Sequence, residues 1–339
     1  MRITDVRATQ PRTPADPPES DWRTALGQIL VVVETDAGLR GLGVGGGGAA
    51  GIHVVQNVLR SLVVGAEVED VPAIERLWQR MYRATVPYGR KGLAIMAISG
   101  VDLALWDALG KLRKESVARL LGGPRHTRVP CYATTQQPVE AVARGFQAVK
   151  LSVGRGDVDE AIARVAQTRA EIGPAVRLFT DAGGQWDRVQ SWRAAEEFAA
   201  YDVGWLEEPL PADGLEGYAE LVRRSPVPIA GGEHEYTVHG FRELAAHRAH
   251  HIWQPDVCWT GGLTQLRAIY ALAAEAGVRV VPHRGGEVWA LHAIAALDPQ
   301  PLAESGRPWM TWVRGQPEIA GGEIEVPDRP GFGVEVDVV

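Results

Sequence analysis

The order of apolar and polar residues changes once along the chain, near residue 125. Before this point, from Ile3 to about Gly48, the pattern is typical of antiparallel strands. Residues 28–35 are apolar and mostly β-branched, residues 36–38 form a turn, and residues 39–43 return, which predicts a meander. The first part of the chain is therefore expected to begin as a small sheet.

Helices are predicted after this sheet. Asp70 stands in an N-cap position before an amphipathic stretch that begins with Val71-Pro72. Apolar residues at helical spacing predict a long helix over about 92–113. The glycines at 45–48 predict a mobile loop, and because no Lys-Ser or Lys-Thr pair follows them, a nucleotide site is not expected there.

After residue 125, short apolar runs alternate with amphipathic helical stretches, which is typical of parallel βαβ units. The runs end at Val149, Phe179, Leu206, Ile229, Trp253, Val281 and Leu302. We therefore expect a smaller α+β domain over 1–125 and an α/β barrel domain over 126–314. The tail, 315–339, has no barrel repeat and is expected to return to the smaller domain as a short strand segment.

An ionisable residue stands just after each of these runs. The series is Lys150, Asp181, Glu207, Glu233, Asp256, His283 and Glu304, and neighbours in it are 21 to 31 residues apart. One βα unit of a closed barrel has about this length, because roughly 250 residues supply eight units, and the strand ends meet at one mouth where catalytic residues lie. A single acid in such a position is more often a helix cap or a surface charge, but a series in phase with the strands predicts an active site.

Three neighbouring members of the series predict a metal site. Asp181, Glu207 and Glu233 offer only hard oxygen ligands, which favour Mg²⁺. On adjacent strands their charges repel one another unless a cation neutralises them. Glu208, next to Glu207, is either a supporting residue or a surface charge.

Asp256 and His283 predict a proton-transfer pair, because they end consecutive strands. A hydrogen bond from one imidazole nitrogen to the carboxylate would fix the tautomer and raise the basicity of the other nitrogen. The alternative for His283 is a structural histidine. The histidines at 234, 239, 247, 250 and 251 are expected in loops or on the surface.

Charge and cysteine content narrow the class of protein further. The net charge of -7 argues against a nucleic-acid or anionic-membrane partner, since both require a basic face. Cys131 and Cys258 form no motif and are expected to be buried, reduced thiols of a cytoplasmic protein. Neither a signal peptide nor an uncharged apolar run of membrane-spanning length is visible.

At these residues the sequence resembles the enolase superfamily, in its mandelate racemase-like branch, over nearly the whole chain. The segments that carry the resemblance are 100–111 (GVDLALWDALGK), 120–123 (LLGG), 205–209 (WLEEP), 232–233 (GE), 254–256 (QPD), 261–262 (GG) and 281–283 (VPH). The resemblance implies a capping domain over a modified (β/α)7β barrel, with Mg²⁺ held by Asp181, Glu207 and Glu233. It also implies that Asp256 and His283 remove the proton α to a carboxylate, and that the chain forms a homo-oligomer, from dimer to octamer.

Ser152 separates this chain from many relatives. They often end the second barrel strand with Lys-x-Lys, whose second lysine is an acid/base on the opposite face, whereas this chain has Lys150-Leu151-Ser152. An unassisted serine hydroxyl is too weak a base for racemisation, but a β-elimination needs only one group. His283 would take the α-proton and protonate the departing hydroxyl. Segments such as 88–92 and 254–264 are similar to acid-sugar dehydratases, most of all the L-rhamnonate dehydratase group.

We therefore expect a Mg²⁺-dependent hydro-lyase that converts a small-molecule acid sugar into a 2-keto-3-deoxy acid. Lys150 and Glu304 are candidate contacts for the substrate carboxylate, although a structural role for Lys150 explains it equally well. Arg23 and His53 are candidate substrate-binding residues of the capping domain. Two alternatives stay open: a racemase or epimerase of a 2-hydroxy or amino acid derivative that uses another base, and an inactive metal-binding barrel that acts as a binding protein.

Overall fold

The N-terminal domain is built on a three-stranded antiparallel sheet. The structure is a computed structural model, and it describes residues 1–11, 27–305 and 312–336. The strands are β1 (Ile3–Thr9), β2 (Ile29–Thr35) and β3 (Arg40–Gly45), paired in the order β1-β2-β3. The meander expected over residues 28–43 is thus present, and β3 continues two residues further than the pattern indicated.

Helices cover this sheet. They are α2 (Gly48–Val54), the π-helical η1 (Val55–Leu59), α3 (Arg60–Val63), α4 (Val71–Thr85), α5 (Leu93–Arg113) and α6 (Val117–Leu120). As the sequence predicts, Asp70 caps α4, because its Oδ1 accepts a hydrogen bond of 2.8 Å from the Ala73 amide. The predicted long helix corresponds to α5 within one residue at its start.

The glycines of β3 let α5 lie directly against the sheet. A Cβ added at Gly41, Gly43 or Gly45 would lie between 2.0 and 2.4 Å from a carbonyl oxygen of α5, which no side chain allows. The prediction of a mobile loop over 45–48 is therefore wrong at both ends, since Gly45 belongs to β3 and Gly48 begins α2. Close packing of a helix on a strand explains the glycines that pattern alone assigned to a loop.

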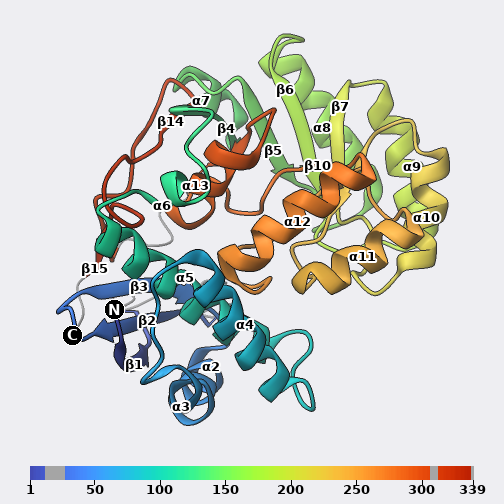
Figure 1. Ribbon diagram of the computed structural model, residues 1–339. Helices are drawn as coiled ribbons and strands as arrows, with labels where there is room; N and C mark the ends of the chain where they lie inside the picture. Colours follow the sequence, from blue (N-terminus) through green and yellow to red (C-terminus); the bar gives the residue numbers. More distant parts are fainter. Residues whose placement is uncertain (12–26, 306–311, 337–339) are drawn as a thin grey trace.

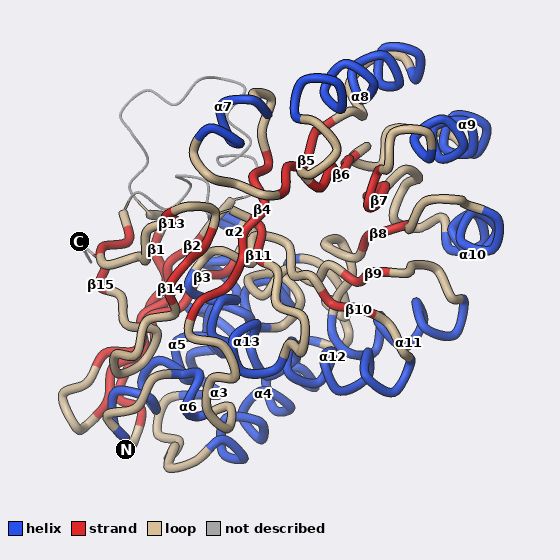
Figure 2. Tube along the Cα trace, turned by 90° about the horizontal axis from the view of Figure 1, so that it is seen from above, coloured by secondary structure: helices blue, strands red, loops and turns tan. Residues whose placement is uncertain are grey.

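The barrel domain alternates parallel strands with helices. Its strands are β4 (Arg128–Thr134), β5 (Ala148–Ser152), β6 (Arg177–Asp181), β7 (Val203–Glu207), β8 (Ile229–Gly231), β9 (Ile252–Trp253), β10 (Arg279–Val280) and β11 (Ala303–Glu304). Its helices are α7 (Pro138–Ala143), α8 (Val158–Ile172), α9 (Arg188–Ala199), α10 (Leu215–Arg224), α11 (Thr237–His247), α12 (Gly262–Ala276) and α13 (Val288–Leu297). Figure 2 shows the strands as an inner ring with the helices outside it.

These elements form the (β/α)7β barrel that the resemblance implied. Successive strands from β4 to β10 pair in parallel, and β11 pairs in parallel with β4 on its other side. The seven apolar runs of the sequence correspond to β5–β11. The first barrel strand, β4, was not among these runs. It ends at Thr134, so no ionisable residue marks its end.

An apolar layer fills the interior of the barrel. It consists of Tyr132, Ala148, Phe179, Trp205, Ala230, Ile252, Val281 and Leu302, one residue for each strand, and all are buried. The rings of Phe179 and Trp205 stack with centroids 3.5 Å apart, and Tyr132 meets both rings edge-on. The barrel is thus closed beneath its mouth, as a packed core rather than a pore.

Buried hydrogen bonds join the capping domain to the start of α12. Thr264 donates its backbone N–H to Asp102 at 3.0 Å and accepts a bond of 3.0 Å from the Trp106 indole. The Trp78 indole donates to the Gly261 carbonyl at 2.7 Å, and Ser99 Oγ accepts from the Gly261 amide at 2.9 Å. The motif at 100–111 therefore holds the two domains together, and α5 lies between the capping sheet and the barrel (Figure 1).

The C-terminal segment contacts both domains. Its strand β14 (Glu323–Glu325) pairs antiparallel with β4 of the barrel and with β13 (Ile319–Ala320), while β12 (Val313–Arg314) pairs with β15 (Glu335–Val336). The Phe332 amide donates to the buried Asp107 carboxylate of α5 at 2.9 Å. The tail thus returns to the capping domain, and the boundaries near 125 and 315 stay predictions.

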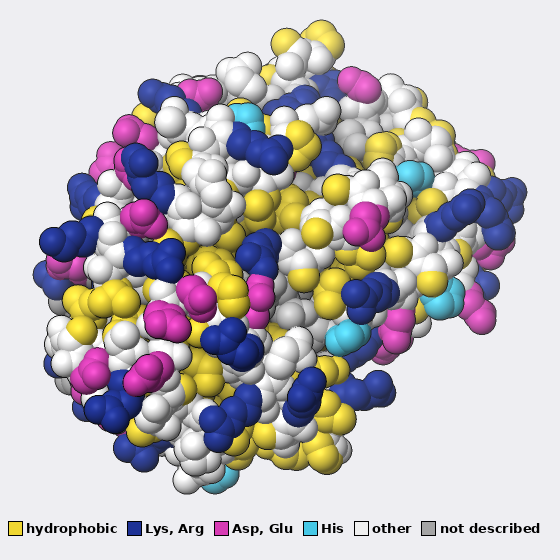
Figure 3. Space-filling view, viewed as in Figure 1, with side chains coloured by type: hydrophobic (Ala, Val, Ile, Leu, Met, Phe, Trp, Pro, Cys, Tyr) yellow, Lys and Arg dark blue, Asp and Glu magenta, His cyan; other side chains and the backbone are white. Residues whose placement is uncertain are grey.

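One helix of the described residues, α5, has the length and apolar composition of a membrane span. Of its most apolar window, 89% is buried inside the protein, against the sheet and the barrel. On the face drawn in Figure 3, basic and acidic side chains are interspersed and do not gather by sign.

Candidate active site

A layer of mostly polar and charged side chains lies directly above the apolar layer. Side chains on a strand alternate between its two faces, so residues two positions further along point to the same side. Two positions after the members of the apolar layer stand Thr134, Lys150, Asp181, Glu207, Gly232, Gln254, His283 and Glu304. Five of the seven residues predicted from the sequence belong to this layer, and Glu233 and Asp256 follow it by one and two residues.

Lys150 is the centre of one half of this layer. Its Nζ lies 2.7 and 2.8 Å from the two carboxylate oxygens of Glu207, 3.4 Å from Glu304 and 3.7 Å from Asp181. The Lys150 side chain is 1% exposed. Burial lowers the pKa of Lys150, but the surrounding carboxylates, above all Glu207, raise it well above its usual value. Lys150 is therefore a fixed cation and not a base.

Glu207 is held on several sides. Besides Lys150, its Oε2 accepts hydrogen bonds from the Gln254 amide at 2.7 Å and the Trp205 indole at 3.2 Å. Burial raises the pKa of Glu207, the neighbouring carboxylates of Asp181 and Glu304 add to this, and Lys150 opposes it. Positive charge placed near these acids would stabilise their ionised forms.

Asp256 and His283 form the predicted pair in the other half of the layer. His283 Nδ1 lies 2.9 Å from Asp256 Oδ2, and both side chains are buried. Burial opposes ionisation of Asp256, but Arg284 and His283 lower its pKa to about 2. Burial lowers the pKa of His283, but Glu233, Asp256 and Glu304 together raise it to about 9. The ionised carboxylate thus holds Nδ1 and leaves Nε2 for proton transfer. Since Glu233 is the carboxylate that raises the pKa of His283 most, a cation bound by Glu233 would lower this pKa and favour the neutral, basic imidazole.

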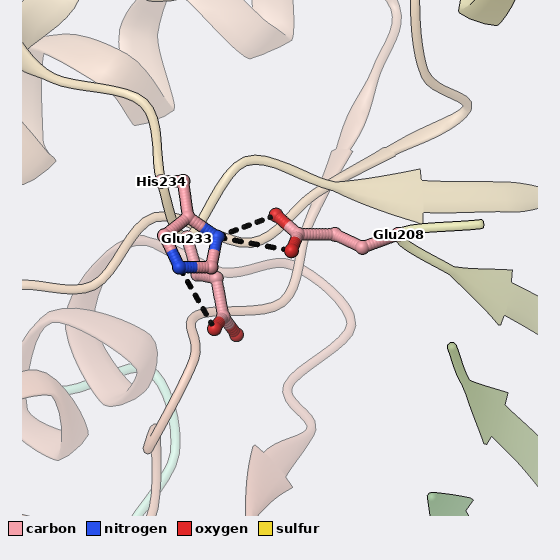
Figure 4. Close-up of side chains that lie close together, drawn as sticks. All are labelled: Glu208, Glu233 and His234. Carbon is pink, nitrogen blue, oxygen red and sulfur yellow. Dashed lines mark hydrogen bonds and ion pairs between the residues drawn. The ribbon is translucent and has the colours of Figure 1, made fainter. Parts of the chain in front are cut away.

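Glu233 stands between two histidines. One of its oxygens lies 3.3 Å from His283 Nε2 and the other 3.9 Å from His234 Nε2. His234 Nδ1 faces the Glu208 carboxylate at 3.0 and 3.1 Å, as Figure 4 shows. Among the described residues, Glu208, Glu233 and His234 form the group whose ligand atoms lie within 4.8 Å of one another. Glu208 is therefore a buried partner of His234 and not a surface charge.

The acids predicted to hold Mg²⁺ have the right chemistry but face two directions. Glu207 and Asp181 turn to Lys150, whereas Glu233 turns to His283 and His234. The three nonetheless stand at the ends of adjacent strands, since Asp181 ends β6, Glu207 ends β7 and Glu233 follows β8. Burial raises the pKa of Glu207 and of Glu233, and the negative charge of Asp181 raises both further. Hard oxygen donors that destabilise each other in this way fit a divalent cation.

Glu304 links the two halves of the layer. Its side chain is fully buried, bonds the Thr134 hydroxyl, accepts a 2.8 Å hydrogen bond from the Arg284 backbone amide and lies 3.9 Å from His283 Nε2. With Lys150 on its other side, it stands between the fixed cation and the imidazole.

One of the two capping-domain residues predicted to bind substrate, His53, lies apart from this layer. His53 is exposed on α2, where its Nδ1 lies 3.2 Å from Asn57, and no hydrogen bond or ion pair joins it to a described residue of the barrel. Arg23 lies outside the described residues. Ser152, in place of a second lysine, ends β5 beside Asp181 of β6.

Sequence reasoning missed several members of the site. Gln254 was passed over because the acid two residues later drew attention, although counting two positions from Ile252 identifies it. Thr134 was missed with its strand. His250 lies in a loop, as expected, between α11 and β9, but it is buried, at 7% exposed, and burial lowers its pKa to about 4.

Comparison with known families defines the class of protein. Residues 3–122 match the model of the mandelate racemase / muconate lactonizing enzyme N-terminal domain, and residues 134–338 match that of the enolase C-terminal domain-like family. The chain therefore belongs to the mandelate racemase and muconate lactonizing enzyme group of the enolase superfamily.

Individual relatives carry two different activities in their names. L-rhamnonate dehydratase from Saccharopolyspora erythraea is 40% identical over 330 residues, which cover 92% of this chain and 84% of the relative. The crystal structure of L-rhamnonate dehydratase from Gibberella zeae superimposes with a TM-score of 0.89 at 31% identity, over 99% of this chain and 94% of the relative. A racemase from Streptomyces coelicolor with bound magnesium has the same TM-score at 33% identity, over 99% of this chain.

Proposed function

We propose that this protein is an acid-sugar dehydratase, a hydro-lyase that converts a 2,3-dihydroxy carboxylate into a 2-keto-3-deoxy acid. The observation that carries the proposal is an Asp256–His283 pair on one side of the barrel mouth with a serine, Ser152, on the other. The strands β10 and β5 that lead to these residues lie on opposite sides of the ring in Figure 2. The similarity to L-rhamnonate dehydratases supports the same class of reaction.

A single base is sufficient for this reaction. His283 Nε2 takes the α-proton, and the electrons of the C–H bond stay on the α-carbon and its carboxylate. The same nitrogen then returns the proton to the β-hydroxyl, which leaves as water with the electrons of the C–O bond while the C=C bond forms. The enol product becomes the 2-keto acid. Lys150 does not compete as a base, because Glu207 holds its ammonium group.

The charges in the mouth suit the substrate carboxylate. Mg²⁺ bound by Asp181, Glu207 and Glu233 would supply positive charge that stabilises the negative charge developing on the substrate carboxylate. Lys150 keeps Glu207 and Asp181 oriented, and Glu304, buried between Lys150 and His283, is in position to hydrogen-bond the same carboxylate when protonated.

A library of aldonic and aldaric acids tests the proposal. We expect the protein with Mg²⁺ to produce 2-keto acid from one acid or a few stereochemically related acids, and to lose this activity when a chelator removes the metal. L-rhamnonate belongs in the library because of the named relatives. If no member gives 2-keto acid under conditions in which the protein is folded and binds Mg²⁺, the proposal is wrong.

A racemase is the second candidate, because a racemase with bound magnesium is among the similar structures. It would require an acid/base on the face opposite His283, where the second lysine is replaced by Ser152. Incubation in D₂O separates the two reactions. A racemase would give the inverted acid with deuterium at the α-carbon and all hydroxyls retained, whereas a dehydratase gives the 2-keto acid.

A further inference from the structure

Arg284, the residue after the candidate base, is buried in direct contact with both Asp256 and Glu304. We propose that Arg284 is a positioning residue that clamps Asp256 and Glu304 from behind and so fixes the imidazole of His283. The proposal rests on the proposed function, in which His283 is the base, but it concerns a residue that the reaction itself does not use.

The guanidinium group of Arg284 grips the Asp256 carboxylate by both oxygens. Its Nε lies 2.9 Å from Oδ2, and its Nη2 lies 3.0 Å from Oδ1 and 2.8 Å from Oδ2. The planar fork of an arginine matches a carboxylate in this way and fixes the plane of the carboxylate as well as its position. The Cys258 amide adds a bond of 2.8 Å to Oδ1.

This grip decides where Asp256 points. Oδ2, held by Arg284 on one side, is the oxygen that receives Nδ1 of His283 at 2.9 Å. Without Arg284 the Asp256 carboxylate would keep the Cys258 amide bond at Oδ1, but Oδ2 would lose its arginine contacts. The position of Oδ2, and of the imidazole bonded to it, would then be less well fixed. A base that must reach one carbon atom loses rate when its orientation is no longer fixed.

The backbone of Arg284 holds the other side of the site. Its amide donates a 2.8 Å hydrogen bond to Glu304 Oε2, and its φ of +53° lies in the left-handed region, which is unfavourable for a residue with a side chain. The turn that this conformation creates lets the side chain reach Asp256 while the amide reaches Glu304. One residue thus sets the relative positions of the candidate base and the candidate carboxylate contact.

The surroundings of Arg284 leave its side chain little freedom. The guanidinium carbon lies 5.4 Å from the centre of the Trp259 ring, whose centre is 5.8 Å from that of His283. Glu287, buried on the first turn leading into α13, adds a carboxylate to the same environment. The arginine is therefore buried next to the dyad, among the carboxylates of Asp256 and Glu287 and the ring of Trp259.

Three variants test the proposal through kcat and KM for the acid that the wild-type protein turns over. We expect Arg284→Met to lower kcat by about 10- to 100-fold, as the loss of an outer supporting residue does, and to leave KM within about threefold. Arg284→Lys keeps the charge but cannot span both oxygens of Asp256, so its kcat should lie between that of the wild type and that of Arg284→Met. In the Asp256→Asn variant, adding Arg284→Met should lower kcat little further, because the two residues act together.

Arg169→Met is the matched control. Arg169, a half-buried residue of α8, also holds several groups at once. It donates to the backbone carbonyls of Gly173, Val176, Tyr201 and Asp202, which lie before the starts of β6 and β7, at the end of the barrel away from the mouth. It should lower the unfolding temperature and leave kcat unchanged. An unchanged kcat in Arg284→Met, an effect on KM alone, or losses that multiply fully with Asp256→Asn would each overturn the proposal.

A measurement without turnover separates this proposal from the proposed function. In protein labelled with ¹⁵N-histidine, the hydrogen-bonded Nδ1 proton of His283 should give a downfield resonance that Asp256→Asn removes. Arg284→Met should shift or broaden it, Arg284→Lys should do so less, and Arg169→Met should leave it in place. A resonance that is identical in Arg284→Met and wild type contradicts the clamp, even if no substrate has been found.

Discussion

The barrel interior contains two layers of side chains, two residues apart on the same strands, that are held by different forces. In the lower layer, Phe179 and Trp205 stack, Tyr132 meets them edge-on, and small residues such as Ala148 and Ala230 fill the remaining space. In the upper layer, charges replace these contacts, and Lys150 touches three carboxylates. One layer is stabilised by apolar burial and the other by matched charge.

This difference shows why the two layers respond differently to change. An apolar layer of mixed sizes tolerates substitutions that conserve volume. A buried charged network does not, because removal of one partner leaves another charge without compensation in a medium of low polarity. The upper layer should therefore be the more sensitive of the two, and three substitutions test this view.

The largest expected effect comes from His283→Asn in the upper layer. Asparagine keeps a polar group of similar reach but cannot exchange a proton, so kcat should fall by about 10²- to 10⁴-fold, the usual contribution of general acid–base catalysis. Exchange of the α-proton in D₂O should disappear together with elimination. Both are measured on the acid identified in the library.

The unfolding temperature is the control for this variant, and it should fall only slightly, because Asp256 keeps its ion pair with Arg284. If α-proton exchange persists in folded His283→Asn, another group is the base. In that case His283 would not give the charged layer its catalytic role, although the difference in stabilising forces between the two layers would remain.

The upper layer could be predicted from the sequence because its residues recur at the ends of the strands. The prediction was limited to residues with an ionisable side chain. Residues such as Lys150, Asp181 and His283 were found because an ionisable side chain at a strand end is visible in the sequence. Gln254 was missed because it is neutral. The clamp by Arg284 depends on a left-handed backbone conformation and on contacts with residues far away in the sequence. Neither feature leaves a periodic pattern in the sequence.

The lower layer was harder to predict for the opposite reason. An apolar run marks a strand but does not say which of its residues points inward. The glycines at 41, 43 and 45 show the same limit, because the helix that requires them is more than 40 residues away. Polar ends of strands therefore identify a site better than apolar interiors identify a core.

An intermediate effect is expected for Lys150→Met, which removes the cation of the upper layer and keeps the length of the side chain. Glu207 and Glu304 would then be buried without it, so the free energy of unfolding should fall by about 3–5 kcal/mol. Urea denaturation measures this loss. A double variant, Lys150→Met with Glu207→Gln, should recover part of the stability. If Lys150→Met is as stable as the wild type, charge matching does not hold the layer.

The smallest effect is expected for Phe179→Leu in the lower layer. The side chain stays apolar and buried, and it loses mainly the stacking on Trp205, so the free energy of unfolding should fall by about 1 kcal/mol. Because Asp181, two residues further on, keeps its contact with Lys150, kcat should change less than about twofold. Phe198→Leu, in a buried position of α9 outside the barrel interior, makes the same chemical change as a control. If Phe179→Leu lowers kcat tenfold while Phe198→Leu does not, the lower layer positions the charged layer through packing, and the two layers are not separable.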